Sequence, residues 1–530
     1  MDFPNIYSLF RSQCEKYAEE PVFYTRSHDG WDMQTWAEFE EKVHDLACAF
    51  LAKGLTKGAS VAILAGNIPE WTICDIAVIA AGGVGVGIYP TSSPEQCEFV
   101  IRHSDAEFVL VDTAAQLDKI SSFEFPKVKG TLCIEDGSFD EFLRFGASQR
   151  EAFMPQVDAI GLGSHIDDTA IMVYTSGTTG EPKGAMLSHR YILNSVESLR
   201  RSVPVLEDDV ALSYLPGCHV AERISGIYNR LYNGTAAYFV DDLSRLYEYM
   251  LDVKPTVFAS LPRFFEKIHA SVVAKGGPDG VDSETLRNAF GGRVRLLTSG
   301  GAPLPLEIAD FYERLGLPIL QAYGLTENIC VAFNTVEAHR HGTVGRPMPM
   351  CEVRIAADGE ILVKSEMMFS GYYKEPEKTA EMFDTDGWLK TGDLGELDAD
   401  GFLKITGRKK EIIVLSSGKN VSPALVENLV KESHLISHCY VHGDGHSYCV
   451  ALITINDAEA ANLCREEIAG LVQQAVENAN RRLSTSEQIK RFKILANDLS
   501  AGRDEITPTM KIKRSVVAAN YAEILETLYV

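Results

Sequence analysis

In the N-terminal half of the chain, short unbroken apolar runs alternate with stretches in which apolar residues recur at helical spacing. Helical spacing extends from Tyr7 to Lys53 and recurs around Glu70 to Ala81. Buried strands are predicted at 60–65, 85–88, 108–112, 131–134, 170–174, 237–240 and 294–298. Strands that alternate with helices predict a parallel, doubly wound arrangement, here one large α/β unit with two sheets.

After Asn334 the pattern changes to short strands separated by Gly and Asp turns. Residues 353–363 predict a hairpin around Asp358-Gly359, within a small antiparallel β region. A boundary is predicted near 407–410, and a smaller unit begins at Glu411 and continues to the C-terminus. Two or more domains are expected, because 530 residues exceed what one hydrophobic core of about 250–300 residues accommodates.

The charge balance restricts the ligands that the surface attracts. The chain carries 50 basic and 74 acidic residues, a net charge of −24, with 45% hydrophobic residues. Its overall field repels nucleic acid, and we expect no nucleic-acid partner. An anionic ligand must therefore be held locally, by backbone N–H groups, a metal ion and a few placed cations.

The 11 cysteines are scattered, without a CxxC pair or a Cys/His cluster at zinc-ligand spacing, which favours reduced thiols and suggests no structural metal. The N-terminus lacks the pattern of a signal peptide, and the longest apolar stretch, 73–89, contains Asp75. We expect a cytoplasmic protein without a transmembrane segment, and the sequence leaves peripheral membrane contact open.

The segment YTSGTTGEPKG, residues 174–184, is rich in glycine and hydroxyl groups and follows an apolar strand. With a helix expected from Ser188 to Arg200, its backbone N–H groups and Lys183 can converge on phosphate oxygens. It is not a Walker A loop, because Pro182 and Gly184 occupy the places of the second glycine and the Mg²⁺-binding hydroxyl. The alternative is a flexible surface loop.

This segment resembles the phosphate-loop signature of the adenylate-forming (ANL) superfamily, which includes AMP-forming acyl-CoA synthetases, adenylation domains and luciferases. Four further segments with the family's appearance follow in order: SGGAP at 299–303, YGLTE at 323–327, KTGD at 390–393, and GRKK at 407–410 with Ser417-Gly418 beyond it. The resemblance therefore covers nearly the whole chain.

The resemblance assigns the phosphates of ATP to the first segment, through Thr175, Ser176, Gly177, Thr178, Thr179, Gly180 and Lys183. It assigns adenine to a second group, Gly300, Gly301, Ala302, Tyr323 and Gly324. Backbone without large side chains can face a flat base, and an aromatic ring can cover the other side. Taken singly, SGGAP is better explained as a strand that ends in a turn.

Thr326 and Glu327 offer a hydroxyl and a carboxylate for the α-phosphate and for Mg²⁺, which prefers oxygen ligands. Asp393 can accept both ribose hydroxyls and Arg408 can donate to the same sugar, and the resemblance implies these roles. A helix cap, a turn aspartate and a surface arginine are the structural alternatives.

The resemblance also implies a mobile C-terminal domain. Lys410 matches the hinge position, Gly418 the loop that lines the thiol tunnel, and Lys511 the catalytic lysine. We therefore expect an N-terminal domain over 1–407 (α/β to 334, β region over 335–407), a hinge over 408–412 and a smaller α+β domain over 413–530. Lys513 and Arg514 are interpreted as a solvated basic face.

LPGCHVAER at 215–223 resembles the LPxxHxxER stretch of long-chain and bubblegum-type fatty-acyl-CoA synthetases, as do 88–95 and the TPTMKIKR segment. Fatty acids are thus the leading substrate class, with His219 beside the acyl carboxylate or, alternatively, a hydrogen-bonded core histidine. Glu222 and Arg223 are interpreted as a pair on a helix surface.

This chain departs from those synthetases at two places that line the acyl pocket in the family. They are Gly217-Cys218 and Asn328-Ile329-Cys330. The substrate could therefore be a specialised or small acid instead of a long-chain one. A further alternative is that Cys218 acts as a nucleophile.

The resemblance implies that the chain activates a carboxylic acid with Mg-ATP as acyl-AMP, releases pyrophosphate, and then transfers the acyl group to CoA. One alternative loads the phosphopantetheine of an acyl carrier protein. A second, a noncatalytic nucleotide-binding protein, is disfavoured because Lys183, Glu327, Asp393, Arg408 and Lys511 are all present.

Overall fold

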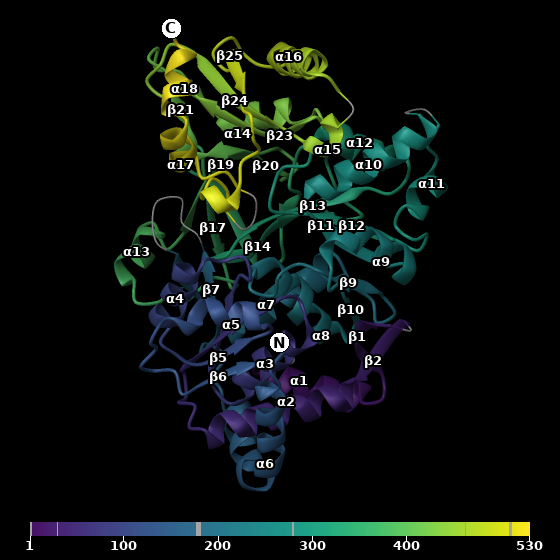
Figure 1. Ribbon diagram of the computed structural model, residues 1–530, viewed down its shortest axis with the longest axis vertical. Helices are drawn as coiled ribbons and strands as arrows, with labels where there is room; N and C mark the ends of the chain where they lie inside the picture. Colours follow the sequence, from purple (N-terminus) through teal and green to yellow (C-terminus); the bar gives the residue numbers. More distant parts are fainter. Residues whose placement is uncertain (1–2, 29, 176–181, 278–279, 462, 508–510) are drawn as a thin grey trace.

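The computed structural model describes residues 3–28, 30–175, 182–277, 280–461, 463–507 and 511–530. It is a mixed α/β protein in which a large N-terminal domain lies below a smaller C-terminal domain in the view of Figure 1. In the part of the chain that is described, no helix is both long and apolar enough to span a membrane.

A seven-stranded sheet has the order β18-β8-β7-β4-β3-β5-β6. Its strands are β3 (Ser60–Leu64), β4 (Val84–Ile88), β5 (Ala106–Val111), β6 (Gly130–Cys133), β7 (Thr169–Thr175), β8 (Lys183–Ser188) and β18 (Gly371–Tyr372). β3 to β7 are parallel to one another, whereas β8 and β18 add an antiparallel edge. Because β4 and β5 lie on opposite sides of β3, the winding reverses there, as predicted for a doubly wound sheet.

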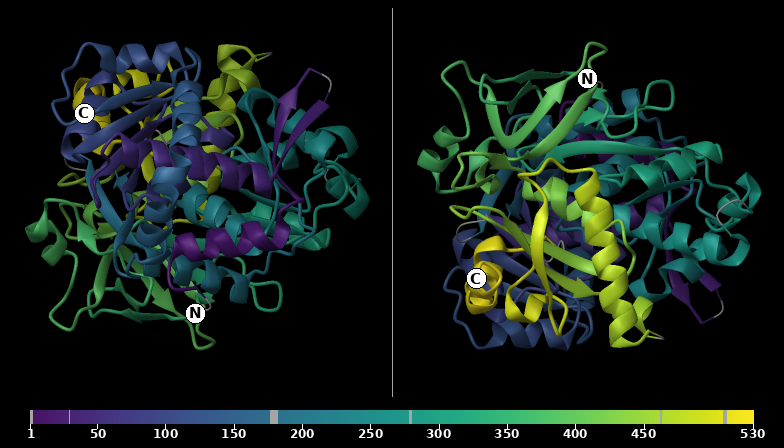
Figure 2. Two further views of the ribbon diagram at one scale, coloured as in Figure 1. Left: turned by 90° about the horizontal axis from the view of Figure 1, so that it is seen from below. Right: turned by 90° about the horizontal axis from the view of Figure 1, so that it is seen from above.

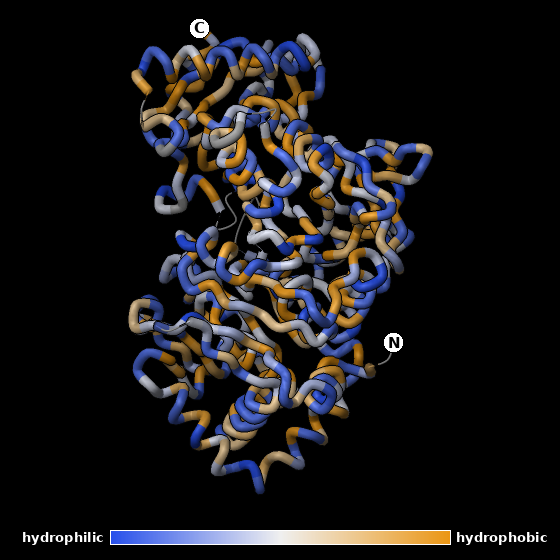
Figure 3. The backbone as a smooth tube through the Cα atoms, turned by 90° about the vertical axis from the view of Figure 1, so that its right-hand side faces the viewer, coloured by the Kyte–Doolittle hydropathy of each residue, from blue (hydrophilic) through white to orange (hydrophobic). Residues whose placement is uncertain are grey.

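Alternate side chains of β3 enter two different cores. Val61 and Ile63 pack with α1 (Ile6–Tyr17), α2 (Trp36–Ala52), α3 (Pro69–Ala80) and α6 (Ser138–Leu162). Ala62 and Leu64 pack with α4 (Pro94–His103) and α5 (Ala114–Ser121). Helices therefore cover both faces, and Figure 3 shows hydrophobic and hydrophilic residues interleaved along the outer ones.

The helical spacing predicted from Tyr7 to Lys53 is interrupted by a hairpin of β1 (Pro21–Ser27) and β2 (Gly30–Thr35). This hairpin extends a sheet that contains β9 (Ala211–Ser213) and β10 (Ala237–Phe239). A two-stranded hairpin with one partly exposed face has too few apolar residues to disturb a helical period, so the sequence pattern missed it.

A third, five-stranded sheet has the order β11-β12-β13-β14-β15, so this α/β unit contains three sheets where two were predicted. Its strands are β11 (Val257–Ser260), β12 (Leu296–Ser299), β13 (Ile319–Leu325), β14 (Asn328–Phe333) and β15 (Arg346–Pro347). The helices of this part of the chain are α7 (His189–Ser202), the π-helix η1 (Glu222–Tyr228), α8 (Asn229–Asn233), η2 (Leu243–Arg245), α9 (Leu246–Val253), α10 (Pro262–Gly276), α11 (Ser283–Asn288) and α12 (Leu306–Arg314).

The predicted antiparallel β region is confirmed as a four-stranded sheet of β16 (Cys351–Ile355), β17 (Glu360–Ser365), β19 (Leu389–Leu397) and β20 (Leu403–Arg408), with α13 (Pro376–Glu381) beside it. The hairpin around Asp358-Gly359 is also confirmed, with Ile355 opposite Ile361. Gly359 has a φ of +86°, a left-handed conformation that favours glycine at this turn.

The C-terminal domain has its own core and a three-stranded sheet of β23 (Ile436–His442), β24 (Cys449–Ile455) and β25 (Ile489–Ile494). Figure 2 shows this domain covering part of the N-terminal domain when the molecule is seen from above. Its other elements are η3 (Lys409–Glu411), β21 (Ile413–Val414), β22 (Asn420–Val421), α14 (Pro423–Val430), α15 (Asp457–Ala460), α16 (Arg465–Arg481), η4 (Ala501–Arg503), α17 (Arg514–Asn520) and α18 (Ala522–Thr527).

Candidate active site

The glycine-rich segment connects two antiparallel strands. Thr175, the last residue of β7, lies opposite Lys183, the first residue of β8, and α7 begins only at His189. The helix expected from Ser188 to Arg200 is confirmed as α7, and β8 lies between the segment and this helix. Five predicted phosphate ligands lie outside the described residues: Ser176, Gly177, Thr178, Thr179 and Gly180.

Tyr372 joins Lys183 to Glu327, and the sequence analysis did not identify it. The Lys183 ammonium lies 4.8 Å from the centre of the Tyr372 ring, and the Tyr372 hydroxyl donates to the Glu327 carboxylate. Tyr372 reaches this position because β18 pairs with β8, which places it opposite Ala185. Tyr372 thus contacts the Lys183 cation through its ring and the buried Glu327 carboxylate through its hydroxyl.

The predicted Thr-Glu pair occupies the tight turn between β13 and β14. A Cβ on Gly324 would lie 1.9 Å from the Ile329 carbonyl oxygen, so this position requires glycine. The hydroxyl of the buried Tyr191 donates to the Thr326 carbonyl and accepts from the Ile329 N–H, both at 3.0 Å. The turn that presents Thr326 and Glu327 is therefore braced from below by α7.

Gly300, Gly301 and Ala302 follow β12 and are partly or fully exposed. Gly301 has a φ of +76°, and a Cβ on Gly300 would meet no atom closer than the Ala322 carbonyl oxygen at 3.8 Å. Since β12 and β13 are parallel neighbours, this accessible backbone and Tyr323 lie at the same end of the sheet. Ligands of open α/β sheets bind at these carboxyl ends.

Asp393 is buried and is contacted by two of the other predicted residues. The Tyr323 hydroxyl donates to Oδ2 of Asp393 at 2.6 Å, and Nε of Arg408 lies 2.8 Å from Oδ1. The antiparallel register of β19 and β20 places Asp393 directly opposite Arg408. Burial, followed by the Asp393 charge, raises the pKa of Tyr323, so its phenol stays protonated and can donate.

Lys511 extends the same group of charges from the C-terminal domain. Desolvation by the surrounding protein lowers the pKa of Lys511, and Arg408 acts in the same direction against Asp393 and Glu411. The Lys511 residue nevertheless remains accessible to solvent. Lys513 instead forms an ion pair with Asp504. The structure thus places Lys511, and not Lys513, near the predicted ribose ligands.

His219 also experiences the charge of Lys511. Burial, with the Lys511 charge as a further cause, lowers the pKa of His219 to about 4, so the ring is neutral at pH 7. Its Nδ1 accepts from the Ala221 N–H at 3.1 Å, and the ring of Tyr89 lies 6.5 Å away. A neutral imidazole with Nδ1 occupied leaves Nε2 as the atom able to contact a ligand.

The proposed hinge lies in η3, which connects β20 to the C-terminal domain. Lys409 is anchored by Asp358 at 2.6 Å and Glu360 at 2.8 Å, while Lys410 is exposed. Gly418 has a φ of +76° in the exposed turn between β21 and β22.

Comparison with known proteins identifies the family. The model described as "AMP-binding enzyme" matches residues 10–373, and that described as "AMP-binding enzyme C-terminal domain" matches residues 410–530. The chain belongs to the AMP-binding enzyme family. These matches agree with the predicted adenylate-forming membership.

Relatives in this family match over almost the full chain. The chain is 35% identical to long-chain-fatty-acid–CoA ligase FadD15 of Mycobacterium bovis, covering 96% of this chain and 94% of the relative. It is 29% identical to long-chain-fatty-acid–CoA ligase ACSBG2 of Xenopus laevis, covering 99% and 83%. The ATP-bound MatB structure from Rhodopseudomonas palustris superposes with a TM-score of 0.79 at 25% identity, covering 98% and 99%.

The segment before η1 packs closely against α3 and β4. A Cβ on Gly217 would lie 2.8 Å from the Trp71 ring, and the backbone of Cys218 packs against Gly87 of β4. Burial strongly raises the pKa of the Cys218 thiol, which disfavours the thiolate that a nucleophile requires. These contacts explain the small residues at 217 and 218 by packing against α3 and β4.

The interpretation of Glu222 and Arg223 as a surface pair was wrong. Both are buried within η1, and Arg223 forms an ion pair with Asp75 of α3, whose other oxygen accepts from Tyr228 at 2.7 Å. Glu222 instead pairs with Arg230 at 2.8 Å. Glu222 and Arg223 pair with residues of other elements, because consecutive residues of a helix project in different directions.

Arg514 also departs from the sequence-based interpretation. It is not part of a solvated basic face, because it pairs with Glu427 at 2.7 Å and lies over the Tyr440 ring at 4.7 Å. Arg514 therefore fixes the start of α17 against α14 and β23, close in sequence to Lys511.

Proposed function

We propose that the chain is a fatty-acid–CoA ligase that forms acyl-AMP and then acyl-CoA. The observation that carries the proposal is the gathering of Lys511, Arg408, Asp393 and Tyr323 from both domains at one end of the five-stranded sheet that contains β13. The 35% identity to a protein named a long-chain-fatty-acid–CoA ligase supports a long-chain acid as the substrate class.

In the first step, an oxygen of the fatty-acid carboxylate attacks the α-phosphorus of ATP, and the bond to the bridging oxygen of pyrophosphate breaks. We assign Asp393 and Arg408 to the ribose, Tyr323 with Gly300, Gly301 and Ala302 to adenine, and Lys183 to the phosphates. The Lys511 ammonium then stabilises the charge that develops between the carboxylate and the α-phosphate. His219, with Nε2 available, is assigned to the acyl carboxylate.

Glu327 and Thr326 would hold Mg²⁺. A buried carboxylate beside a hydroxyl is a set of hard oxygen donors, and the Tyr372 hydroxyl fixes the Glu327 side chain in place. The ion would supply charge neutralisation at the phosphates.

In the second step, the CoA sulfur attacks the acyl carbonyl carbon and AMP leaves. No strong general base is needed, because a thiol with a pKa near ~8.5 ionises readily. We propose that the C-terminal domain rotates about Lys410 between the steps, which withdraws Lys511 and brings the Gly418 turn toward the thiol. The free, mostly buried cysteines fit a reducing compartment, and we propose the cytoplasm.

The test is a substrate panel. Fatty acids of increasing length, short acids and aromatic acids are compared for pyrophosphate release, with CoA or a phosphopantetheinylated carrier protein as acceptor. The proposal expects long-chain acids and CoA to give the highest kcat/KM. A preference for the carrier protein would contradict CoA as the acceptor. A preference for a short or aromatic acid would contradict the long-chain substrate class.

A further inference from the structure

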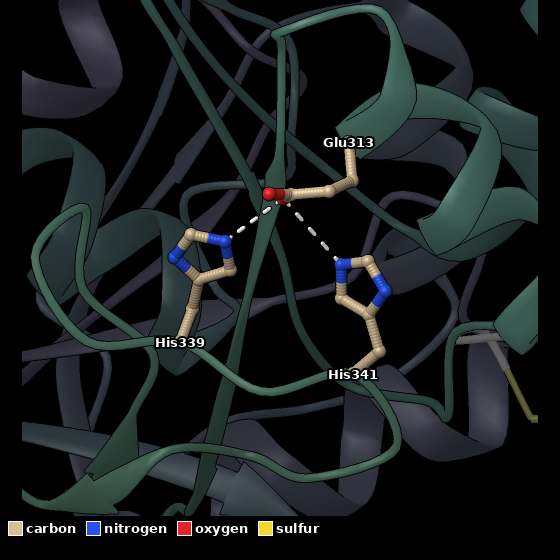
Figure 4. A group of neighbouring side chains, drawn as sticks. All are labelled: Glu313, His339 and His341. Carbon is tan, nitrogen blue, oxygen red and sulfur yellow. Dashed lines mark hydrogen bonds and ion pairs between the residues drawn. The ribbon is translucent and has the colours of Figure 1, made fainter.

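We propose that Glu313, His339 and His341 form a binding site for one divalent ion of the Zn²⁺ type. These three residues are the one group of potential ligands that converges within the described part of the chain, and their ligand atoms lie within 4.8 Å of one another. Glu313 lies in α12, and both histidines lie in the loop that follows β14. Figure 4 shows both rings turned toward the Glu313 carboxylate.

The distances fit a tetrahedral ion. Nε2 of His339 lies 2.8 Å and Nε2 of His341 lies 3.6 Å from the same Glu313 oxygen, Oε2. Ligand atoms bound to zinc at about 2.0–2.2 Å in a tetrahedron are about 3.3 Å apart. Side-chain adjustments would therefore bring all three atoms to one ion, with a fourth position left for water.

Other contacts already orient both rings for ligation through Nε2. Nδ1 of His341 lies 2.5 Å from the Asp310 carboxylate, and Nδ1 of His339 lies 3.3 Å from the Thr335 carbonyl oxygen. An acceptor at Nδ1 favours the tautomer whose Nε2 lone pair is free, the arrangement found in carboxylate–histidine–zinc sites.

The environment of the His341 ring is not explained by ion pairs alone. Its Nε2 atom is buried and makes no hydrogen bond within the described residues, although it faces the Glu313 carboxylate. A buried polar atom without a hydrogen bond is costly, and a metal ion would satisfy it. Imidazole nitrogens with one carboxylate favour Zn²⁺ over the hard oxygen-seeking ions.

This site lies away from the predicted nucleotide ligands. Arg340, between the two histidines, pairs with Asp398 and, at 2.7 Å, with Asp400 at the turn of the β19–β20 hairpin, whereas Asp393 and Arg408 lie at its other end. The ion would tie α12 to this loop and so to the hairpin. No local motif predicts this site, because it contains no cysteine pair and Glu313 is distant in sequence from both histidines.

The test titrates the full-length chain, with any affinity tag removed, with Co²⁺ and then Zn²⁺. A Cys464→Ser background removes the exposed thiol. We expect one ion per chain, the visible absorption of low-coordinate Co²⁺ displaced by Zn²⁺, and a higher thermal unfolding midpoint. His339→Ala and His341→Ala should abolish the signal, and Asp310→Asn should weaken affinity by about 10–100-fold.

His165→Ala is the matched control, because this histidine is also next to a carboxylate but is 71% exposed. It should bind Co²⁺ like the parent chain. Glu313→Gln, at a half-exposed side chain, keeps the test decisive if a histidine variant fails to fold. Absence of a Co²⁺ spectrum in the parent, or an unchanged spectrum in the His339, His341 and Glu313 variants, would overturn the proposal.

Discussion

Nε of Arg408 lies 2.8 Å from Oδ1 of Asp393, so two residues assigned to the ribose already hold each other in place. Asp393→Asn removes a charge-assisted acceptor, which contributes about 1.5–3 kcal/mol, and should lower kcat/KM for ATP by about 10–100-fold. Steady-state kinetics with ATP varied measures this. Asp386→Asn, at a 72% exposed side chain in the same β region, should leave the value unchanged.

Lys511 and Lys513 provide a direct comparison of two neighbouring cations. Lys511→Ala should reduce acyl-AMP formation by about 100–1000-fold, as expected for loss of a group that stabilises transition-state charge. Transfer from synthetic acyl-AMP to CoA should be retained, because Lys511 is withdrawn in that step. Lys513→Ala, which removes only the pair with Asp504, should retain both steps. Equal losses in the two variants would refute the assignment.

The pH dependence follows from the lowered pKa of Lys511. The ammonium form exists below that pKa, so adenylation should fall as pH rises through a value lower than the 10.5 of an ordinary lysine. Lys511→Arg should move this alkaline limb to higher pH, since a guanidinium stays charged. A limb that does not move in the Arg variant would assign the titration to another group.

Tyr372 contributes separable contacts to Lys183 and Glu327. Tyr372→Phe keeps the ring beside Lys183 but removes the hydroxyl from Glu327, and should cost about 1 kcal/mol, roughly five-fold in kcat/KM for Mg-ATP. Tyr372→Leu also removes the aromatic face and should cost more. Tyr373→Phe, which removes the hydroxyl that donates to Asp105, is the matched control and should match the parent.

The buried pair of Asp75 and Arg223 should affect stability rather than chemistry. Asp75→Ala leaves an uncompensated buried guanidinium, a change that typically costs about 3–5 kcal/mol, and should lower the thermal unfolding midpoint markedly. Asp167→Ala breaks the exposed pair with Arg190 and should cost at most about 1 kcal/mol. Similar midpoints for the two variants would contradict this interpretation.

The sequence predicted the parts of the fold that depend on local patterns. The runs predicted at 60–65 and 108–112 correspond to β3 and β5, which are buried on both faces, and such strands read directly as unbroken apolar segments. The β1–β2 hairpin lacks this signal because β2 contains no fully buried residue. Local periodicity therefore identified strands that read as unbroken apolar runs, such as β3 and β5, and missed strands without such a run, such as β2.

The candidate site was predictable where short signatures contain the residues, as for Asp393, Arg408 and Lys511. It was not predictable where a contact depends on strands distant in sequence. Tyr372 meets Lys183 only because β18 pairs with β8, and Arg223 meets Asp75 only because η1 packs on α3. Such pairings follow from topology, which no single segment encodes.

The most direct test of the proposed function is acid-dependent release of pyrophosphate from Mg-ATP in the absence of any thiol, with the acyl-adenylate identified by mass spectrometry. We expect a long-chain fatty acid to yield bound acyl-AMP, and added CoA to convert it to acyl-CoA and AMP. ATP binding without pyrophosphate release for any acid in the panel would contradict the assignment of the chain as an acid–CoA ligase.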